Sequence, residues 1–343
     1  MSQIDKEHPV IDKYLKTPDG ALLRYRHWKP TTTSDIKPHV LLLPGRATAL
    51  EKLEAAVDIL RERGYGIWAL DWRGQGLSTR EAGKRGYIQS YEIYLRDLDL
   101  FIRNFLKTDY VKRPVVMLAH SMGGHIGLRY MAENPGVIDG AVLTAPMLDI
   151  NTGLYSRHLA RVLSNFMVRL GFGKTYVYTQ GDYNPVTQPF EGNILTHNQE
   201  AFYYHRHLQI ENPDIVVGGV TFGWIKATLD SIENLISPQK LGEIKVPVKI
   251  YAAGEERVVD NTRIEHIVDW IPQCELEIIQ GARHELLAEV LSVKTRIFNG
   301  FDRFVQQNFD LPIIDHSRKD ILVSQKAPLQ ELKPLPISIH SDR

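Results

Sequence analysis

The stretch that decides the fold reads Val115-Val116-Met117-Leu118-Ala119-His120-Ser121-Met122-Gly123-Gly124-His125-Ile126. Apolar, β-favouring residues end at Ala119, helix-compatible residues resume at Met122, and one serine lies between them. This pattern predicts a strand, a sharp turn and a helix, with the Ser121 hydroxyl at the apex of the turn. The small residues Ala119 and Gly123 fit such a turn, because it brings the backbone and the helix close together.

The bulk composition is that of an ordinary soluble globular protein. The chain has 343 residues, of which 43% are hydrophobic and 24% are charged. The 41 basic and 41 acidic side chains leave a formal net charge of +0, which argues against a nucleic-acid partner bound through bulk charge. One cysteine allows no disulfide within the chain. We see neither a signal peptide nor a run of the roughly 20 apolar residues that cross a membrane, and we therefore expect a cytoplasmic location.

Strands and helices alternate along most of the chain. Apolar runs at 40–43, 66–70, 115–119, 140–145 and 246–253 are typical of strands buried in a parallel sheet, with helical spacing between them. This predicts an α/β fold with a mostly parallel sheet and helices on both faces. The alternation fails from 146 to 238, which we interpret as a helical cap (lid). Residues 1–145 and 239–311 would then form the core, and 312–343 a polar tail.

Serine chemistry requires a base and an orienting acid. A serine hydroxyl is a weak nucleophile alone, and in hydrolases of this architecture the acid and then the histidine follow the serine along the chain. His284, in the loop after the last strand, is the candidate base. The loop after the preceding strand offers three carboxylates as the acid: Glu255, Glu256 and Asp260. We expect Glu255 to point elsewhere, which leaves Glu256 and Asp260. Asp260 is also explained as the N-cap of the next helix.

The developing negative charge needs two N–H donors. One is the backbone N–H of Met122, the residue after the nucleophile. By analogy with the corresponding loop of lipases, the other would be the N–H of Arg46, in the Pro44-Gly45-Arg46 turn after an early strand. This chemistry requires no metal ion and no organic cofactor.

Four segments together resemble the serine α/β-hydrolase fold. They are Pro44-Gly45-Arg46, Asp71-Trp72-Arg73-Gly74-Gln75-Gly76-Leu77-Ser78, Ala119-His120-Ser121-Met122-Gly123-Gly124 and Gly281-Ala282-Arg283-His284-Glu285. More narrowly, they resemble the bacterial lysophospholipase and monoacylglycerol lipase group, which is filed with serine aminopeptidases. The chain departs from the family pattern where Ala119 replaces a glycine and Glu256 replaces the common aspartate.

The resemblance implies a function and a partner. It implies a serine esterase that releases a fatty acid from a lysophospholipid or monoacylglycerol through an acyl-enzyme. Ser121, Glu256 and His284 would be catalytic, with Asp260 as the alternative acid. The partner would be a small lipid or ester, and peripheral contact with the inner membrane would fit such a substrate.

Substrate choice would be decided in the cap. Residues 159–170 place apolar side chains at helical spacing, which indicates either a lid helix that lines an acyl site or a helix packed on the core. From this cap we select Leu163, Phe166, Phe222 and Trp224 as candidate substrate-binding residues.

Two rival functions remain open at this point. A prolyl-type aminopeptidase on the same scaffold would need cap carboxylates, such as Asp182, Glu191 or Glu200, to hold a free amine. A hydrolase-like protein that binds ligands without catalysis is the second rival, although an intact set of serine, acid and histidine argues against it.

Overall fold

One eight-stranded sheet carries the fold, in the order β1-β2-β4-β3-β5-β6-β7-β8. The computed structural model describes residues 11–31, 37–106, 113–152, 156–178 and 180–309. The strands are β1 (Lys13–Lys16), β2 (Leu22–Trp28), β3 (His39–Leu43), β4 (Gly66–Leu70), β5 (Val115–His120), β6 (Gly140–Thr144), β7 (Val248–Ala253) and β8 (Cys274–Ile279). The pairs β1–β2 and β2–β4 are antiparallel, and all the others are parallel. The predicted mostly parallel sheet is confirmed.

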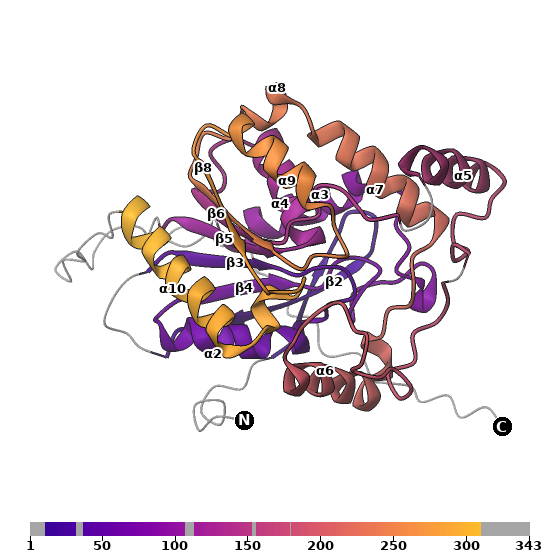
Figure 1. The fold of residues 1–343 in the computed structure, drawn as a ribbon, viewed down its shortest axis with the longest axis horizontal. Coiled ribbons are helices and arrows are strands. Elements are labelled where there is room, and N and C mark those ends of the chain that lie inside the picture. Colours follow the sequence, from indigo (N-terminus) through magenta and orange to yellow (C-terminus); the bar gives the residue numbers. More distant parts are fainter. Residues whose placement is uncertain (1–10, 32–36, 107–112, 153–155, 179, 310–343) are drawn as a thin grey trace. The chain divides into compact units, whose positions relative to one another are not determined.

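Helices cover both faces of the sheet (Figure 1). One face carries α3 (Tyr91–Phe101), which continues as a π-helical turn (Ile102–Leu106), α4 (Met122–Glu133) and α9 (Asn261–Ile267); the other carries α2 (Glu54–Glu62) and α10 (Leu291–Asn308). Every residue of β3 is buried, with Leu41 and Leu43 in one apolar cluster and Val40 and Leu42 in the other. This double burial explains why the central strands read as continuous apolar runs.

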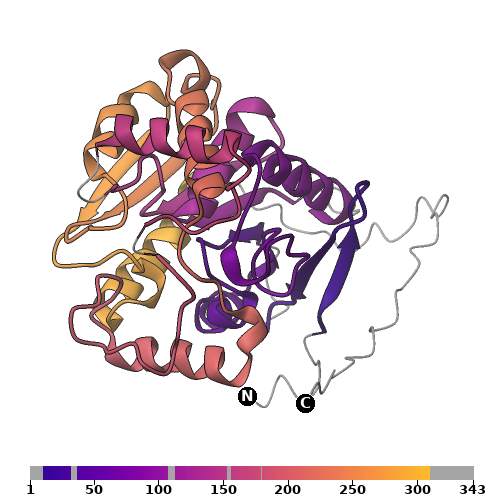
Figure 2. The same ribbon diagram turned by 90° about the vertical axis from the view of Figure 1, so that its right-hand side faces the viewer.

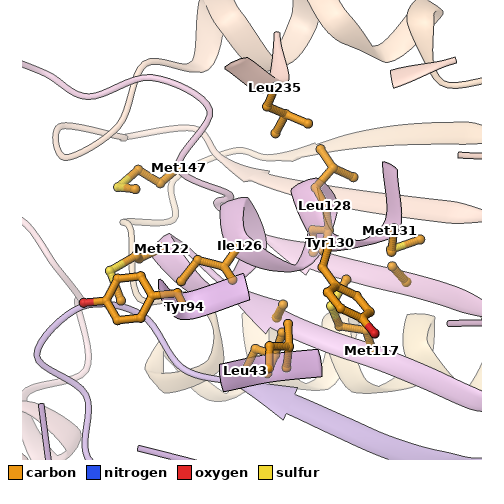
Figure 3. Close-up of a cluster of buried hydrophobic side chains, with 14 of the residues drawn as sticks. Leu43, Tyr94, Met117, Met122, Ile126, Leu128, Tyr130, Met131, Met147 and Leu235 are labelled. Atoms are coloured by element: carbon orange, nitrogen blue, oxygen red, sulfur yellow. The ribbon is translucent and has the colours of Figure 1, made fainter. Parts of the chain in front are cut away.

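The contact between α4 and the sheet places the N-terminus of α4 at the carboxyl end of β5. Figure 3 shows Leu43 and Met117 from the strands gathered with Ile126 and Tyr130 from α4 in one buried cluster. Gly127 allows this close approach, because a Cβ there would lie 2.3 Å from the sulfur of Met117. The first turn of α4 is therefore held directly above the carboxyl end of the strand.

The segment 146–238 is less helical than expected. It contains α5 (Arg157–Arg169), α6 (Gln199–Glu211), a short 3₁₀ turn (Pro213–Ile215) and α7 (Phe222–Leu235). Between α5 and α6 the described residues form turns and irregular chain. Glycine, proline and asparagine are frequent there and favour turns over helix. Helix α5 packs on α7, whereas α6 lies near the 3₁₀ turn Leu50–Leu53 (Figures 1 and 2).

The chain divides into two units, residues 1–311 and 312–343. The predicted core and cap both belong to the first unit. The predicted polar tail is the second unit and lies outside the described residues. Within the described part of the chain, no helix combines the length and the apolarity needed to cross a membrane.

Candidate active site

Ser121 lies on a strained turn between β5 and α4. Its backbone angles are φ 51° and ψ −117°, in a region that residues other than glycine rarely adopt. Hydrogen bonds from the Ser121 N–H to the Thr144 carbonyl (3.0 Å) and from the Met147 N–H to the Ser121 carbonyl (3.0 Å) hold the turn against the end of β6. A Cβ at Gly123 would lie 2.5 Å from the carbonyl oxygens of Leu43 and Pro44, which explains the glycine.

His284 joins Ser121 to Glu256. The His284 Nε2 lies 2.9 Å from the Ser121 Oγ, and the His284 Nδ1 lies 2.8 Å from the Glu256 Oε2. The imidazole and the carboxylate are almost fully enclosed, with side-chain exposures of 5% and 2%. The structure therefore brings together three residues that the sequence places on three separate loops.

Glu256, rather than Asp260, contacts the imidazole. Besides His284, the Glu256 carboxylate accepts backbone N–H groups from Val258 (2.7 Å) and Val259 (3.3 Å). Burial alone would raise the pKa of Glu256, but these hydrogen bonds and the His284 contact hold it below its usual value. Asp260 instead accepts the Thr262 N–H (2.9 Å) as the N-cap of α9, the structural role considered for it above.

The loop after β3 lies directly against the serine turn. A Cβ at Gly45 would lie 3.1 Å from the His120 Cδ2 and 3.3 Å from the Ser121 Cβ, so a larger residue would crowd the serine turn. The next residue is Arg46, and α4 begins at Met122. Among the residues that the structure describes, the backbone N–H groups of Arg46 and Met122 donate to no other group. Both remain available to a ligand beside Ser121.

The loop 71–78 supports the Arg46 loop. The fully buried Gln75 accepts the Ala47 N–H at 2.6 Å, and the Trp72 indole N–H donates to the Pro44 carbonyl at 2.8 Å. In the sequence, this loop is one of the segments that resemble the α/β-hydrolase family, but no role could be assigned to Trp72 or Gln75. Their partners lie 28 positions away in the chain, and only the fold brings them together.

A partly buried polar cluster beside His284 was not predicted from the sequence. The Lys52 ammonium lies 2.5 Å from the carboxylate of Glu285, and the rings of His120 and His284 are 4.9 Å apart. Burial, aided by His284, lowers the pKa of His120 to about 4. Burial would raise the pKa of Glu285, but Lys52 and the nearby histidines hold it well below its usual range. No sequence signal links Lys52 with Glu285, which are 233 positions apart.

A cavity of about 400 Å³ opens on Ser121 and His284. Its wall is largely apolar and includes Met147, Ile150, Leu195, Phe202, Leu208, Val217, Val220, Trp224, Ile225 and Val259. The charged groups in the wall are Arg46, Lys52, Arg206 and Glu285. A second cavity of about 490 Å³ lies beside α6 and shares Gly45, Lys52, His120, His205, Glu285 and Ala288 with the first. Among the described residues, no three His, Cys, Asp or Glu side chains lie close enough together to hold a metal ion.

Of the four cap residues selected from the sequence, Trp224 lines the Ser121 cavity. Phe222 is buried at the start of α7 and lines neither described cavity. Leu163 and Phe166 are 39% and 56% exposed on the outer face of α5 and also line neither cavity. The helix packs on α7 through a face that includes its one buried residue, Ser164, which turns these two side chains outward.

Comparisons with known proteins bear on the family and the fold of the chain. The family described as Serine aminopeptidase, S33 matches residues 34–290. The probable lysophospholipase L2 of Haemophilus influenzae is 28% identical, and the alignment covers 85% of this chain and 91% of that protein. The monoacylglycerol lipase of Mycolicibacterium smegmatis is 31% identical over 79% of this chain and 88% of its own. A crystal structure of a soluble variant of monoglyceride lipase from Saccharomyces cerevisiae superimposes with a TM-score of 0.71 at 20% identity, covering 87% of this chain and 95% of that one.

Proposed function

Because this chain belongs to the serine aminopeptidase S33 family and is a serine hydrolase with the α/β-hydrolase fold, we propose that it hydrolyses lysophospholipids or monoacylglycerols with Ser121 as the nucleophile. His284 acts as the general base, and Glu256 orients it. The observation that carries this proposal is the continuous hydrogen-bond chain from Glu256 through His284 to the Ser121 hydroxyl. The named lysophospholipase and monoacylglycerol lipase relatives support the substrate class.

The reaction proceeds in two steps. His284 takes the Ser121 proton through Nε2 as the Oγ attacks the ester carbonyl, and the negative Glu256 stabilises the resulting imidazolium. His284 then gives the proton to the leaving alcohol oxygen, which leaves Ser121 acylated. Water, activated by the same imidazole, attacks the acyl-enzyme and releases the fatty acid. Each proton taken by the imidazole is returned within the same half-reaction.

The N–H groups of Arg46 and Met122 stabilise the oxyanion of the tetrahedral intermediates. Two observations support this role: the Arg46 loop lies against the serine turn, and Met122 is the first residue of α4, directly after Ser121. Such preorganised donors lower the barrier because charge develops where they already point, and one donor typically contributes about 10²–10³-fold in kcat. The apolar wall that includes Met147, Val217 and Trp224 accepts the acyl chain. A cavity of this size is typical of small-molecule sites.

Removing the nucleophile tests the proposal. Ser121→Ala should abolish turnover of p-nitrophenyl butyrate, a lysophospholipid and a monoacylglycerol, and should abolish labelling by a fluorophosphonate probe. Ser90→Ala is the matched control, because it removes a hydroxyl that only caps α3. Unchanged hydrolysis by Ser121→Ala would refute the assignment. Failure of the wild type to label would favour a binding protein without catalytic activity.

The cap carboxylates favour ester hydrolysis over aminopeptidase activity. Asp182 accepts the hydroxyl of Tyr176 at 2.5 Å, and neither Asp182 nor Glu191 lines the cavity at Ser121. Glu200 lines only the second cavity. No described cap carboxylate therefore stands where it could hold a free amine beside the serine. Wild-type enzyme should hydrolyse a lysophospholipid and leave a proline anilide intact; the opposite result would reverse the assignment.

We further propose that α5 contacts the inner membrane from the cytoplasmic side. Its outer face exposes Leu159 (47%), Val162 (50%), Phe166 (56%) and Leu170 (54%). Arg157 and Arg161 are engaged by Asp149 and by Glu233. Because two of the three arginines of α5 are already paired and only Arg169 is left, the contact rests mainly on apolar insertion, and helices of this kind lie in the plane of the membrane surface.

Vesicle binding tests the role of α5. Leu159→Ser combined with Phe166→Ser should weaken sedimentation with phosphatidylethanolamine–phosphatidylglycerol vesicles by about tenfold or more, because apolar area buried in the membrane is lost. Val186→Ser is the control, since Val186 is an apolar side chain, 66% exposed, outside α5. Equal binding of the double variant and the control would refute this contact without affecting the assignment of Ser121.

A further inference from the structure

The guanidinium of Arg46 is a cation in the wall of the Ser121 cavity. It donates to the carbonyl oxygens of Gly218 (2.8 Å) and Gly219 (2.5 Å), and it lies 5.2 Å from the ring centroid of Trp224. Its buried Nε has no hydrogen-bond partner. Among the described residues, no carboxylate forms an ion pair with it. The charge is therefore neutralised by no acidic group of the described chain.

Such an arrangement is energetically unfavourable without a ligand. A buried cation is normally paired with an anion, because carbonyl dipoles replace only part of the hydration that it loses. Burial accordingly lowers the pKa of Arg46 to about 10, which still leaves it charged at neutral pH. A guanidinium carries several N–H donors in a rigid fork suited to phosphate or carboxylate oxygens. The unused Nε donor leaves part of that fork free.

The other cations in the wall differ from Arg46. Lys52 is already paired with Glu285. Arg206, on α6, donates to the carbonyls of Pro185 (2.5 Å) and Val186 (2.7 Å). Arg46 alone of these three follows directly on Gly45, whose backbone touches the serine turn. The backbone of Arg46 therefore lies near Ser121, while its side chain extends along the wall of the same cavity.

We propose that the Arg46 guanidinium binds the phosphate of the substrate head group and makes the enzyme prefer lysophospholipids to uncharged monoacylglycerols. In a lysophospholipid, the glycerol unit alone separates the scissile ester from the phosphate, so both groups fall within the span of one arginine. The backbone N–H of Arg46 serves the oxyanion and its side chain serves the phosphate. This inference rests on the lipid hydrolase function proposed above.

A selectivity ratio tests the inference. The two substrates are lysophosphatidylethanolamine and monoacylglycerol with the same palmitoyl chain, each in micelles of an uncharged detergent. Arg46→Gln should lower the ratio of their kcat/KM values by about 10- to 100-fold, the range expected for a hydrogen bond to a charged group. Any disturbance of the oxyanion loop affects both substrates and cancels in the ratio. Arg46→Lys keeps the charge and should retain part of the preference.

Arg80→Gln is the matched control. Arg80 also donates to a cap carbonyl, that of Val216 (2.8 Å), but it lines neither described cavity. If the guanidinium of Arg46 only fixes the cap, both variants should shift the ratio alike, and the inference is overturned. A drop with Arg206→Gln and none with Arg46→Gln would place the phosphate at α6 and overturn it as well.

Inhibition of the wild type supplies a measurement that needs no variant. Glycerol phosphate should inhibit p-nitrophenyl butyrate hydrolysis competitively, and glycerol should not; equal inhibition by both refutes the phosphate site. If inorganic phosphate inhibits but the selectivity ratio does not respond to Arg46→Gln, the site binds free anions rather than a head group. A wild type that cleaves p-nitrophenyl butyrate but neither lipid contradicts the proposed function, while the inhibition assay still reports on Arg46 separately.

Discussion

Replacing Glu256 by glutamine should lower kcat for ester hydrolysis by about 10⁴-fold, or about 5.5 kcal/mol in the barrier. The reason lies in the direction of each hydrogen bond. One carboxylate oxygen accepts backbone N–H groups, including that of Val258 at 2.7 Å, so the amide oxygen of the glutamine takes this position. The amide NH₂ then faces the Nδ1 of His284, which must accept instead of donating. The imidazole carries its proton on Nε2 and can no longer take the proton of Ser121.

The fold should survive this change. The glutamine keeps the backbone hydrogen bonds and exchanges one charge-assisted bond for a neutral one, a loss of about 1–2 kcal/mol in the free energy of unfolding. The assay is steady-state hydrolysis of p-nitrophenyl butyrate, with urea unfolding as the stability control. Asp260→Asn is the matched variant: asparagine caps a helix as well as aspartate, and activity should stay within about twofold. A Glu256→Gln enzyme within tenfold of the wild type would refute this reasoning.

Three further changes have defined outcomes. Lys52→Met leaves Glu285 buried without its cation, so burial raises the pKa of that carboxyl above its unfolded value of about 4.3. Above the unfolded pKa, the ionised Glu285 stabilises the wild-type fold through Lys52, whereas in the variant the same ionised carboxyl destabilises the fold. Urea unfolding should therefore show a loss of about 3 kcal/mol in the free energy of unfolding at pH 7, and this loss should shrink toward pH 4 as the carboxyl becomes protonated. A loss that does not change with pH would contradict this. Gly123→Ala places a Cβ 2.5 Å from the carbonyl oxygen of Pro44, and thermal unfolding should show a destabilisation of about 1–3 kcal/mol together with lost turnover. Gln75→Leu removes the acceptor that holds the oxyanion loop, so kcat should fall while KM changes little, and an equal change in both would argue against that role.

The sequence predicted the parts of the fold and site that depend on local pattern. Continuous apolar runs indicated the buried parallel strands, and the small residues around Ser121 indicated the turn. The order of loops along the chain indicated His284, because the carboxyl ends of parallel strands meet at one edge of the sheet. The sequence could not separate Glu256 from Asp260, since both lie in the same loop after β7, whose last residue is Ala253. The choice depends on how the turn directs the N–H groups of Val258 and Val259.

Contacts between distant segments could not be predicted. Helical spacing identified the apolar stripe of α5. Spacing shows which side chains share a face of the helix, but it does not show whether that face packs on the core, lines a cavity or is exposed. In the structure that face is exposed, and Phe166 lines neither described cavity. The ion pair between Lys52 and Glu285 could likewise not be predicted, because the two residues are 233 positions apart and no local pattern relates them.

Arg46 joins the catalytic loop to the cap by a single side chain. Its backbone belongs to the loop that lies against the serine turn, and its guanidinium donates to the carbonyl oxygens of Gly218 and Gly219 in the cap. A cap that lifts far enough to break those bonds must also free the arginine, and the loop that carries it loses an anchor at the same moment. The position of residues 218–219 and the position of the loop beside Ser121 are therefore linked through this one side chain.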